Sequence, residues 1–171
     1  MEEAVFYKSA DDTIFVRATG HVTALVCPAL KAAVFGRLDS EPPVQRVYLD
    51  LSECEYMDST FLGLIVGTQK RFGRIAGSRP ADRKAVVLFG VNEPCKGLLR
   101  TIGVLGMVEL SDSQPPFPGD LERLSEESRA SARFILDAHE ELSGLSAENR
   151  ERFAALTSVL KGAAEAEERK D

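Results

Sequence analysis

A carboxylate and two hydroxyls stand together at the head of an apolar run, in the stretch Tyr-Met-Asp-Ser-Thr-Phe-Leu-Gly at residues 56–63. The three polar side chains are Asp58, Ser59 and Thr60. A serine hydroxyl can attack as a nucleophile when a base activates it, can accept a phosphate, or can cap the first turn of a helix. Because ordinary helices also begin with Asp or Ser before an apolar run, the pattern alone favours a helix cap.

Little else in the sequence supplies the groups that catalysis by Ser59 would need. No G-x-S-x-G turn surrounds this serine, and His21 and His139 lie in segments that show no sign of supplying a base. The glycine-rich motifs that bind phosphate are also absent from the sequence. Asp50 and Asp58 could form a carboxylate pair, but Asp50 ends a predicted strand, where it would cap a turn. We therefore predict no catalytic residue and no enzyme, with a nucleotide-binding or hydrolytic α/β enzyme as the remote alternative.

Metal, cofactor and nucleic-acid sites receive equally little support. The three cysteines, Cys27, Cys54 and Cys95, form no C-x-x-C pair, which argues against zinc or a disulfide and predicts small buried side chains. Cys95 could differ, because the amino end of a helix would lower its pKa. Basic residues cluster over 70–84, but the net charge of −6 and the lack of interleaved aromatic residues argue against nucleic acid. We predict no metal, no cofactor and no nucleic-acid partner.

The composition is typical of a globular protein that stays outside the membrane. Of the 171 residues, 44% are hydrophobic and 28% are charged. The apolar runs are shorter than the roughly 20 residues that span a bilayer, and the amino terminus lacks the basic and apolar segments of a secretory signal. The sequence therefore predicts a cytoplasmic location and no contact with membranes.

The sequence before residue 113 alternates between strand and helix patterns. A hairpin is predicted around Asp11-Asp12, a helix begins near Pro28, and Ser59 opens a helix that follows a strand buried on both faces. The predicted elements are two strands within 4–20, a helix over 27–38, a strand over 44–51, a helix over 59–75, a strand over 85–90, a short helix over 93–103 and a strand over 107–111. This order predicts an α/β fold with a small, mostly parallel sheet backed by helices.

A stretch rich in proline, serine and aspartate at 111–120 marks a boundary in the chain. Up to Ser113 the sequence has 14 acidic and 13 basic residues, whereas the remainder has 13 acidic and 8 basic residues. The change in charge balance predicts one domain over 1–113 and a separate C-terminal extension over 114–171.

The extension has the pattern of a helical hairpin. Apolar and small residues recur at spacings of three and four over 120–142, Gly144 ends that helix, and Ser146 caps a second helix with an apolar stripe over 153–163. Two amphipathic helices cannot bury their stripes alone. They must pack on the first domain, on each other or on another chain. A homodimer through these helices and a partner-binding arm are therefore both alternatives to packing within the chain.

The arrangement around Ser59 resembles the STAS family, which is named for sulfate transporters and anti-sigma factor antagonists. The family pattern is a strand that ends in L-D-L-S, a short spacer, a D-S-(S/T) sequence that opens a helix, and a later strand followed by a helix with an L-x-x-x-G ending. The stretches in register with this pattern are 49–52, 57–60, 62–63, Gly90 and 99–103. The resemblance covers about residues 4–112 and stops at the hairpin.

The resemblance implies a cytosolic bacterial anti-sigma factor antagonist that works by partner switching. The unphosphorylated protein would bind an anti-sigma factor that is also a serine protein kinase. Phosphorylation of Ser59 by that kinase would end the binding, and a PP2C-type phosphatase would restore it. The flanking or partner-contact positions that the resemblance implies are Asp58, Thr60, Phe61, Gly63, Thr23 and Asn92, with Thr60 as a secondary acceptor. A STAS-type scaffold or transporter-associated subunit without phosphorylation is the second interpretation.

Phe61 departs from the family pattern, which usually has glycine at this position. It could be a core residue of the helix or an exposed anchor beside Ser59. A phosphate adds a charge of about −2, and this charge disrupts an interface only if the serine contacts the partner. The implied role therefore predicts that Ser59 is an exposed contact residue rather than a buried cap.

Overall fold

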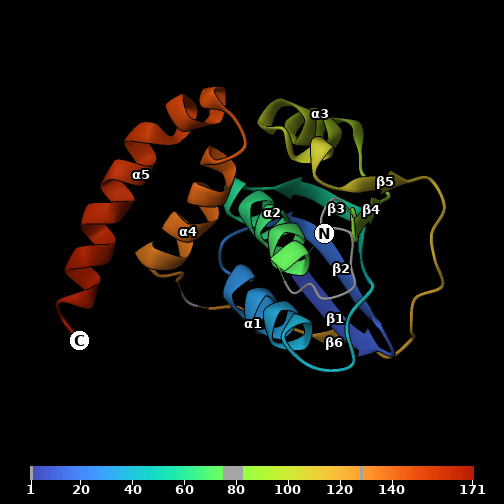
Figure 1. Ribbon diagram of the computed structural model, residues 1–171. Coiled ribbons are helices and arrows are strands. Elements are labelled where there is room, and N and C mark those ends of the chain that lie inside the picture. Colours follow the sequence, from blue (N-terminus) through green and yellow to red (C-terminus); the bar gives the residue numbers. More distant parts are fainter. Residues whose placement is uncertain (1, 75–82, 128) are drawn as a thin grey trace.

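The computed structural model describes residues 2–74, 83–127 and 129–171 (Figure 1). The helices are α1 (Cys27–Leu38), α2 (Ser59–Arg74), α3 (Glu93–Ile102), α4 (Ala132–Ser143) and α5 (Ala147–Glu168), with a 3-10 helix, η1, at Val104–Gly106. The strands are β1 (Ala4–Ala10), β2 (Thr13–Val22), β3 (Arg46–Met57), β4 (Val86–Phe89), β5 (Glu109–Ser111) and β6 (Glu122–Arg123). The order of elements up to β5 is the predicted one.

The six strands form one sheet in the order β5-β4-β3-β2-β1-β6. Strands β2, β3, β4 and β5 run parallel to one another, whereas β1 pairs antiparallel with β2 and with β6. The α/β fold with a mostly parallel sheet is therefore confirmed. Helices α1 and α2 pack on one face of the sheet, and the apolar side chains of β2, β3 and β4 meet those of the two helices in the main core (Figure 1).

The other face of the sheet is partly covered by the chain that follows β5. The ring of Phe117 lies edge-on to Phe15 of β2 at 5.0 Å and to Phe89 of β4 at 5.3 Å. Arg17 of β2 places its guanidinium 5.4 Å from the centre of the same ring. The proline-rich boundary segment thus crosses the sheet and holds an aromatic side chain against it.

The predicted start of the C-terminal helix at residue 120 is wrong. Glu122 and Arg123 instead form β6, which pairs with Phe6 and Tyr7 of β1. The unpaired edge of β1 offers backbone N–H and C=O groups that a local helical pattern cannot reveal. Helix α4 begins at Ala132 after Ser131, which caps it by accepting a hydrogen bond from the Phe134 N–H at 3.1 Å. Ser128, which also belonged to the predicted stripe, lies outside the described residues.

The helical hairpin is present where α4 and α5 meet (Figure 1). Gly144 follows the last turn of α4, and Ser146 caps α5 by accepting a hydrogen bond from the Asn149 N–H at 3.0 Å. The predicted stripe of α5 is only partly buried: Leu156 and Val159 are 41% and 69% exposed. Figure 1 shows why, since α5 is the outermost helix and has α4 alone along most of its length.

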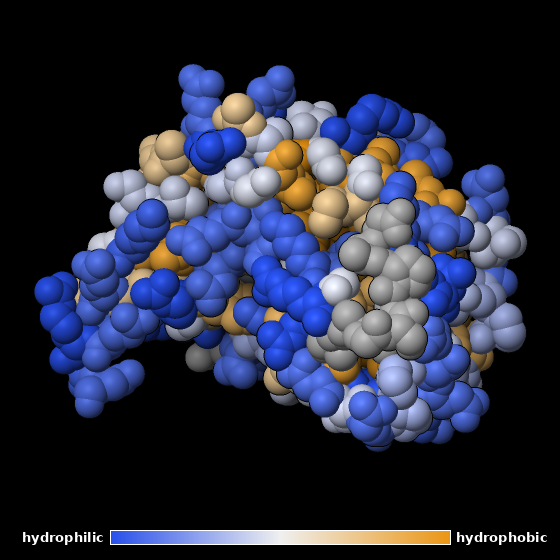
Figure 2. Space-filling model, viewed as in Figure 1, coloured by the Kyte–Doolittle hydropathy of each residue, from blue (hydrophilic) through white to orange (hydrophobic). Residues whose placement is uncertain are grey.

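Side chains on the surface of the hairpin are mostly hydrophilic in the view of Figure 2, and apolar surface appears where the hairpin approaches α3. Helix α5 is the longest described helix, with 22 residues, and it carries many charges. None of the helices in the described parts of the chain is long and apolar enough to cross a bilayer.

Candidate functional site

The candidate site is the amino end of α2, and Asp58 is the residue that caps it. Asp58 Oδ1 accepts a hydrogen bond from the Phe61 N–H at 2.9 Å, which is the bond that an N-cap residue makes. Its other oxygen, Oδ2, accepts from the Ala24 N–H at 2.9 Å and so fixes the loop between β2 and α1. Because Asp58 fills the capping role, the Ser59 hydroxyl is available for another one.

We expect the replacement of Asp58 by alanine to lower the free energy of unfolding by about 1–2 kcal/mol, since α2 loses its cap and the loop at Ala24 loses its anchor. Urea denaturation followed by circular dichroism measures the change. Asp58→Asn is the matched control, because asparagine keeps an acceptor for the Phe61 N–H and should cost less. Equal stabilities of Asp58→Ala and the unmodified protein would show that Asp58 is not the cap.

Ser59 is held by a histidine that lies 80 residues away in the sequence. The Ser59 Oγ and the His139 Nε2 are 2.7 Å apart, and His139 Nδ1 is 2.7 Å from the carbonyl oxygen of Ile135. A carbonyl oxygen can only accept, so Nδ1 carries a proton, and in the neutral imidazole Nε2 accepts from the Ser59 hydroxyl. The His139 side chain is 2% exposed, and its ring lies edge-on to Phe153 of α5 at 5.4 Å.

The two residues meet because α4 lies directly against α2. A Cβ atom on Gly63 would approach the backbone of Ala138, at 2.6 Å from its carbonyl carbon and 2.8 Å from its Cα, so only glycine permits this distance between the helices. Two turns further along α2, Lys70 Nζ lies 2.8 Å from Glu141 Oε2. Helix α4 therefore covers α2 from Ser59 in its first turn to Lys70.

A serine that donates to a histidine is the arrangement of an activated nucleophile. Acyl transfer would also need N–H groups aimed at a developing oxyanion near Ser59. The Phe61 N–H in the first turn of α2 is already engaged by Asp58, and His139 is buried between helices. The geometry favours a serine whose hydroxyl is held in place over a hydrolytic centre.

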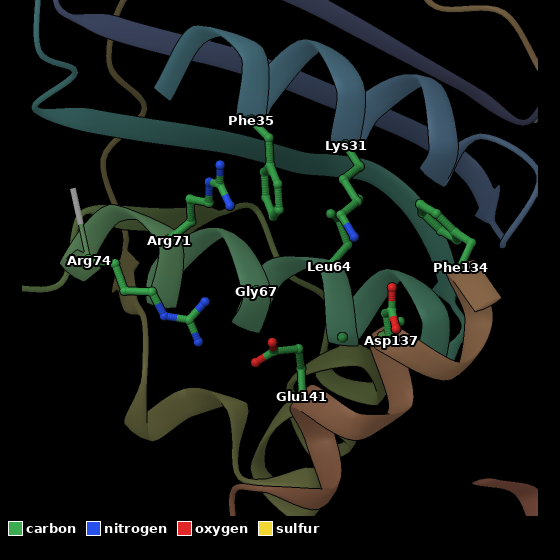
Figure 3. Close-up of a pocket in the computed structure, with 11 residues that line it drawn as sticks. Lys31, Phe35, Leu64, Gly67, Arg71, Arg74, Phe134, Asp137 and Glu141 are labelled. Atoms are coloured by element: carbon green, nitrogen blue, oxygen red, sulfur yellow. The ribbon is translucent and has the colours of Figure 1, made fainter. Parts of the chain in front are cut away.

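A crevice lies between α1, α2 and α4, beside the contact of α4 with α2 (Figure 3). It has a volume of about 60 Å³ and does not include Ser59 in its lining. Basic side chains line it from α1 and α2, whereas acidic side chains line it from α4 (Figure 3). The charged residues that line it are Lys31, Arg71, Arg74, Asp137 and Glu141.

Three of the predicted contact residues are buried in this structure. Phe61 is 0% exposed and belongs to the main core, so the alternative of an exposed anchor beside Ser59 is wrong. Its neighbour Thr60 is buried as well, and Gly63 is covered by α4. The prediction that Ser59 is an exposed contact also needs correction, because its hydroxyl is bonded to His139 and the residue is only partly exposed.

Thr23 and Asn92 occupy different positions relative to Ser59. Thr23 lies in the loop that Asp58 fixes, and both its N–H and its hydroxyl donate to Glu3 Oε1, at 3.0 and 2.8 Å. Asn92 caps α3 by accepting from the Cys95 N–H at 2.9 Å, and its amide donates to the Cys54 carbonyl at the end of β3. The structure thus brings the Thr23 loop to the site and ties Asn92 to the strand that leads into it.

The surroundings of Asp50 and of the cysteines give these residues structural roles. The prediction that Asp50 ends a strand and caps a turn is wrong, because β3 continues past it to Met57. Within the strand, Asp50 accepts hydrogen bonds from the Ser52 N–H at 3.0 Å and from Arg17 Nε at 3.0 Å. Cys95 does lie at the start of α3, but burial raises its pKa, so the predicted lowering is wrong. Burial also raises the pKa of Cys54, to about 12, which makes this thiol a poor nucleophile at neutral pH.

His139 is the site residue that the sequence did not reveal. In the sequence it follows Ala138 within an apolar helical stripe, where a histidine has no recognisable partner. The available signal was a lone histidine on the buried side of an amphipathic helix, which is compatible with many roles. Only the packing of α4 on α2 places it beside Ser59.

The comparisons with known proteins agree on the family. The family model described as Mlab, STAS domain matches residues 5–109. Anti-sigma-B factor antagonists of Listeria monocytogenes and Listeria innocua are each 29% identical to the chain over 109 residues, which cover 64% of this chain and 88% of the relative.

Two solved structures have a similar fold. The unphosphorylated anti-sigma factor antagonist SpoIIAA superimposes with a TM-score of 0.50 at 14% identity, over 64% of this chain and 89% of the other. A candidate anti-sigma factor antagonist from Thermotoga maritima has a TM-score of 0.51 at 24% identity, over 63% of this chain and 85% of the other. The family match ends before α4 and spans more than half of the chain. The protein therefore belongs to the STAS domain family.

Proposed function

We propose that this protein is an anti-sigma factor antagonist in which Ser59 is a regulated phospho-acceptor. The observation that carries the proposal is that Asp58, and not Ser59, caps α2. This leaves a serine hydroxyl at the amino end of a helix, beside a carboxylate, in a chain similar to two anti-sigma-B factor antagonists. The protein then acts by binding and releasing a partner rather than by turning over a substrate.

A phosphate on Ser59 is compatible with the STAS fold. The first turn of a helix has backbone N–H groups without intrahelical partners and a favourable dipole for negative charge. These effects are worth at most about 2 kcal/mol, whereas driving a complex from nearly all bound to nearly all free takes roughly 5.5 kcal/mol. The remainder must come from repulsion and desolvation where the phosphate and Asp58 meet the partner.

The partner in this proposal is an anti-sigma factor that is itself a serine protein kinase. It binds the protein when Ser59 is unmodified and ends the complex by phosphorylating it, and a PP2C-type phosphatase removes the phosphate. All three proteins would work in the bacterial cytoplasm. Thr23 and Asp58 would contact the partner, because the hydrogen bond from the Ala24 N–H to Asp58 holds the loop that contains Thr23 against the start of α2.

A second function is favoured by the bond between Ser59 and His139. A hydroxyl that is permanently held under α4 would never meet a kinase, and the protein would then be a constitutive scaffold or a transporter-associated subunit. The two functions differ in whether Ser59 is modified in the cell.

The decisive measurement is the phosphorylation state of Ser59 in protein isolated from its host during growth and under stress. Mass spectrometry of the peptide that contains Ser59 should find a phosphate whose occupancy changes with the condition. In affinity capture from the same cells, Ser59→Ala should retain a kinase-type anti-sigma factor, and Ser59→Asp should retain at least 100-fold less of it.

Ser113→Asp is the matched control, because it adds the same charge at an exposed serine beyond β5. This variant should capture the partner as well as the unmodified protein does. An unmodified Ser59 under every condition, together with equal capture by Ser59→Asp and Ser59→Ala, would reject the phospho-switch and favour the scaffold.

A further inference from the structure

One face of α2 is occupied by α4 from Ser59 to Lys70. Ser59, Gly63, Gly67 and Lys70 follow at spacings of four, four and three residues, so they lie in one row along the helix. We refer to these four residues as the Ser59 face. The two glycines carry no side chain, which lets α4 approach the backbone of α2 along this row.

Each residue of the Ser59 face has a contact on α4. Ser59 bonds to His139, the Gly63 backbone lies against Ala138, and Lys70 pairs with Glu141. At Gly67, the position that a Cβ would take is 3.8 Å from the Glu141 Cγ. Glu141 Oε2 is buried, and the Lys70 ammonium 2.8 Å away compensates its charge.

The charges on the two sides of this contact are complementary. Figure 3 shows Arg71 and Arg74 on α2 on one side of the crevice, and Asp137 and Glu141 on α4 on the other. Lys31 of α1 extends towards α4, with its Nζ 5.3 Å from the centre of the Phe134 ring. Figure 2 shows hydrophilic side chains over this part of the surface. The Ser59 face and its surroundings thus fit an acidic amphipathic helix with small residues where it crosses Gly63.

The hairpin has a small core of its own. Ala132 and Leu136 of α4 pack with Leu160 and Ala164 of α5 in a cluster that is separate from the main core. Leu142 and Phe153 are the buried hairpin residues that join the main core. An element with its own core can leave its docking surface and remain folded, which is the property of a two-state switch.

With α4 docked, a phosphate on Ser59 in its observed rotamer would collide with His139. A phosphorus atom bonded to Oγ and its three further oxygens would have to enter the space where His139 Nε2 lies 2.7 Å from that oxygen. The imidazole cannot withdraw alone, because it is packed against Phe153 and bonded to Ile135.

We propose that α4 is an intramolecular occupant of the Ser59 face, and that its docking excludes both a phosphate on Ser59 and a partner at the same face. The proposal rests on the proposed function and extends it: the partner binds through an acidic helix that takes the place of α4. The C-terminal hairpin therefore competes with the partner, and the phosphorylated protein keeps its hairpin undocked.

The first test places phosphoserine at position 59 of the full chain during synthesis and measures hydrogen exchange of the α4 amides by mass spectrometry. These amides should exchange at least tenfold faster than in the unmodified protein, while those of β3 stay unchanged. Ser59→Ala, which loses the bond to His139 but adds no bulk, should change α4 exchange less than threefold. Phosphoserine at Ser113 should have no effect. Equal or slower α4 exchange with phosphoserine at position 59 would overturn the exclusion.

The second test uses a labelled synthetic peptide with the sequence of residues 130–145 as a stand-in for the partner helix. The variant with Asp137→Lys and Glu141→Lys weakens docking of its own α4 but keeps the Ser59 face intact. It should bind the peptide at least tenfold more tightly than the unmodified chain does, as measured by fluorescence anisotropy. Equal binding of the peptide by both proteins, or no binding by either, would show that the Ser59 face does not exchange one helix for another.

Both tests are independent of the host kinase, because the phosphate and the peptide are supplied in vitro. An unmodified Ser59 in the host would reject the proposed function and leave these two results standing. If the hairpin stays docked with phosphoserine at position 59, the proposed competition between the hairpin and the partner is rejected, and the phospho-switch is not.

Discussion

Replacement of Gly63 by alanine is expected to push α4 away from α2 and to lower the free energy of unfolding by about 1–3 kcal/mol, the usual cost of overpacking a tight contact. The added Cβ would lie 2.6 Å from the Ala138 carbonyl carbon and 2.8 Å from its Cα. Backbone atoms cannot rotate out of the way as a side chain can. The helices must therefore separate, and the bond between Ser59 and His139 should break with them.

Gly67→Ala is the matched control for this prediction. It lies one turn further along the same face of α2, and its Cβ would meet only side-chain atoms, at 3.8 Å from Glu141 Cγ and from Phe35 Cζ. Alanine is also a better helix former than glycine by about 1 kcal/mol, so this variant should be as stable as the unmodified protein or more stable.

Guanidinium denaturation gives the stabilities of the two glycine variants, and hydrogen exchange reports on α4. Gly63→Ala should be less stable than Gly67→Ala and should show faster exchange over α4. Equal stability and equal exchange of the two variants would mean that α4 does not rest on Gly63 in solution.

Replacement of Phe61 by alanine is expected to lower the free energy of unfolding by about 3–5 kcal/mol. The side chain is 0% exposed and belongs to the main core between α2 and the sheet, so its removal leaves a cavity that the packed surroundings fill only in part. This loss approaches the total stability of many single domains, which is about 5–15 kcal/mol. Urea denaturation at low temperature should resolve it.

Two variants make the Phe61 result specific. Phe61→Leu keeps most of the buried volume and should lose clearly less stability than Phe61→Ala. Leu156→Ala removes a side chain that is 41% exposed on α5 and should change stability by about 0.5 kcal/mol or less. A loss below about 1 kcal/mol for Phe61→Ala would contradict its place in the core and revive the role of an anchor for a partner.

The elements of the STAS fold were predictable because local signals specify them. The turn at Asp11 and Asp12 separates β1 from β2, Pro28 lies in the first turn of α1, and the apolar run before Asp50 forms part of a central strand. Each of these signals acts within a few residues, so it can be recognised in the sequence alone. The start of α4 was not predictable to the same degree, because β6 depends on a free edge that β1 offers from more than 100 residues away.

The candidate site was predictable in part. The sequence placed Asp58 and Ser59 at the start of a helix, and the structure has them there. Their division of roles was not predictable, since either side chain can cap a helix and the choice depends on which oxygen reaches the Phe61 N–H. The sequence also did not predict whether Phe61 is buried, because an aromatic residue in the first turn of a helix can face the core or the solvent.

The sequence by itself determined the α/β order, the helix that begins at Ser59 and a C-terminal hairpin with two amphipathic helices. Only the tertiary structure decided where the hairpin packs, and with it the pairing of Ser59 with His139 and of Gly63 with Ala138. Periodicity states that a helix has an apolar face, but it does not state which surface covers that face. That choice depends on shape and charge across α2 and α4, and these become visible only when both helices are in place.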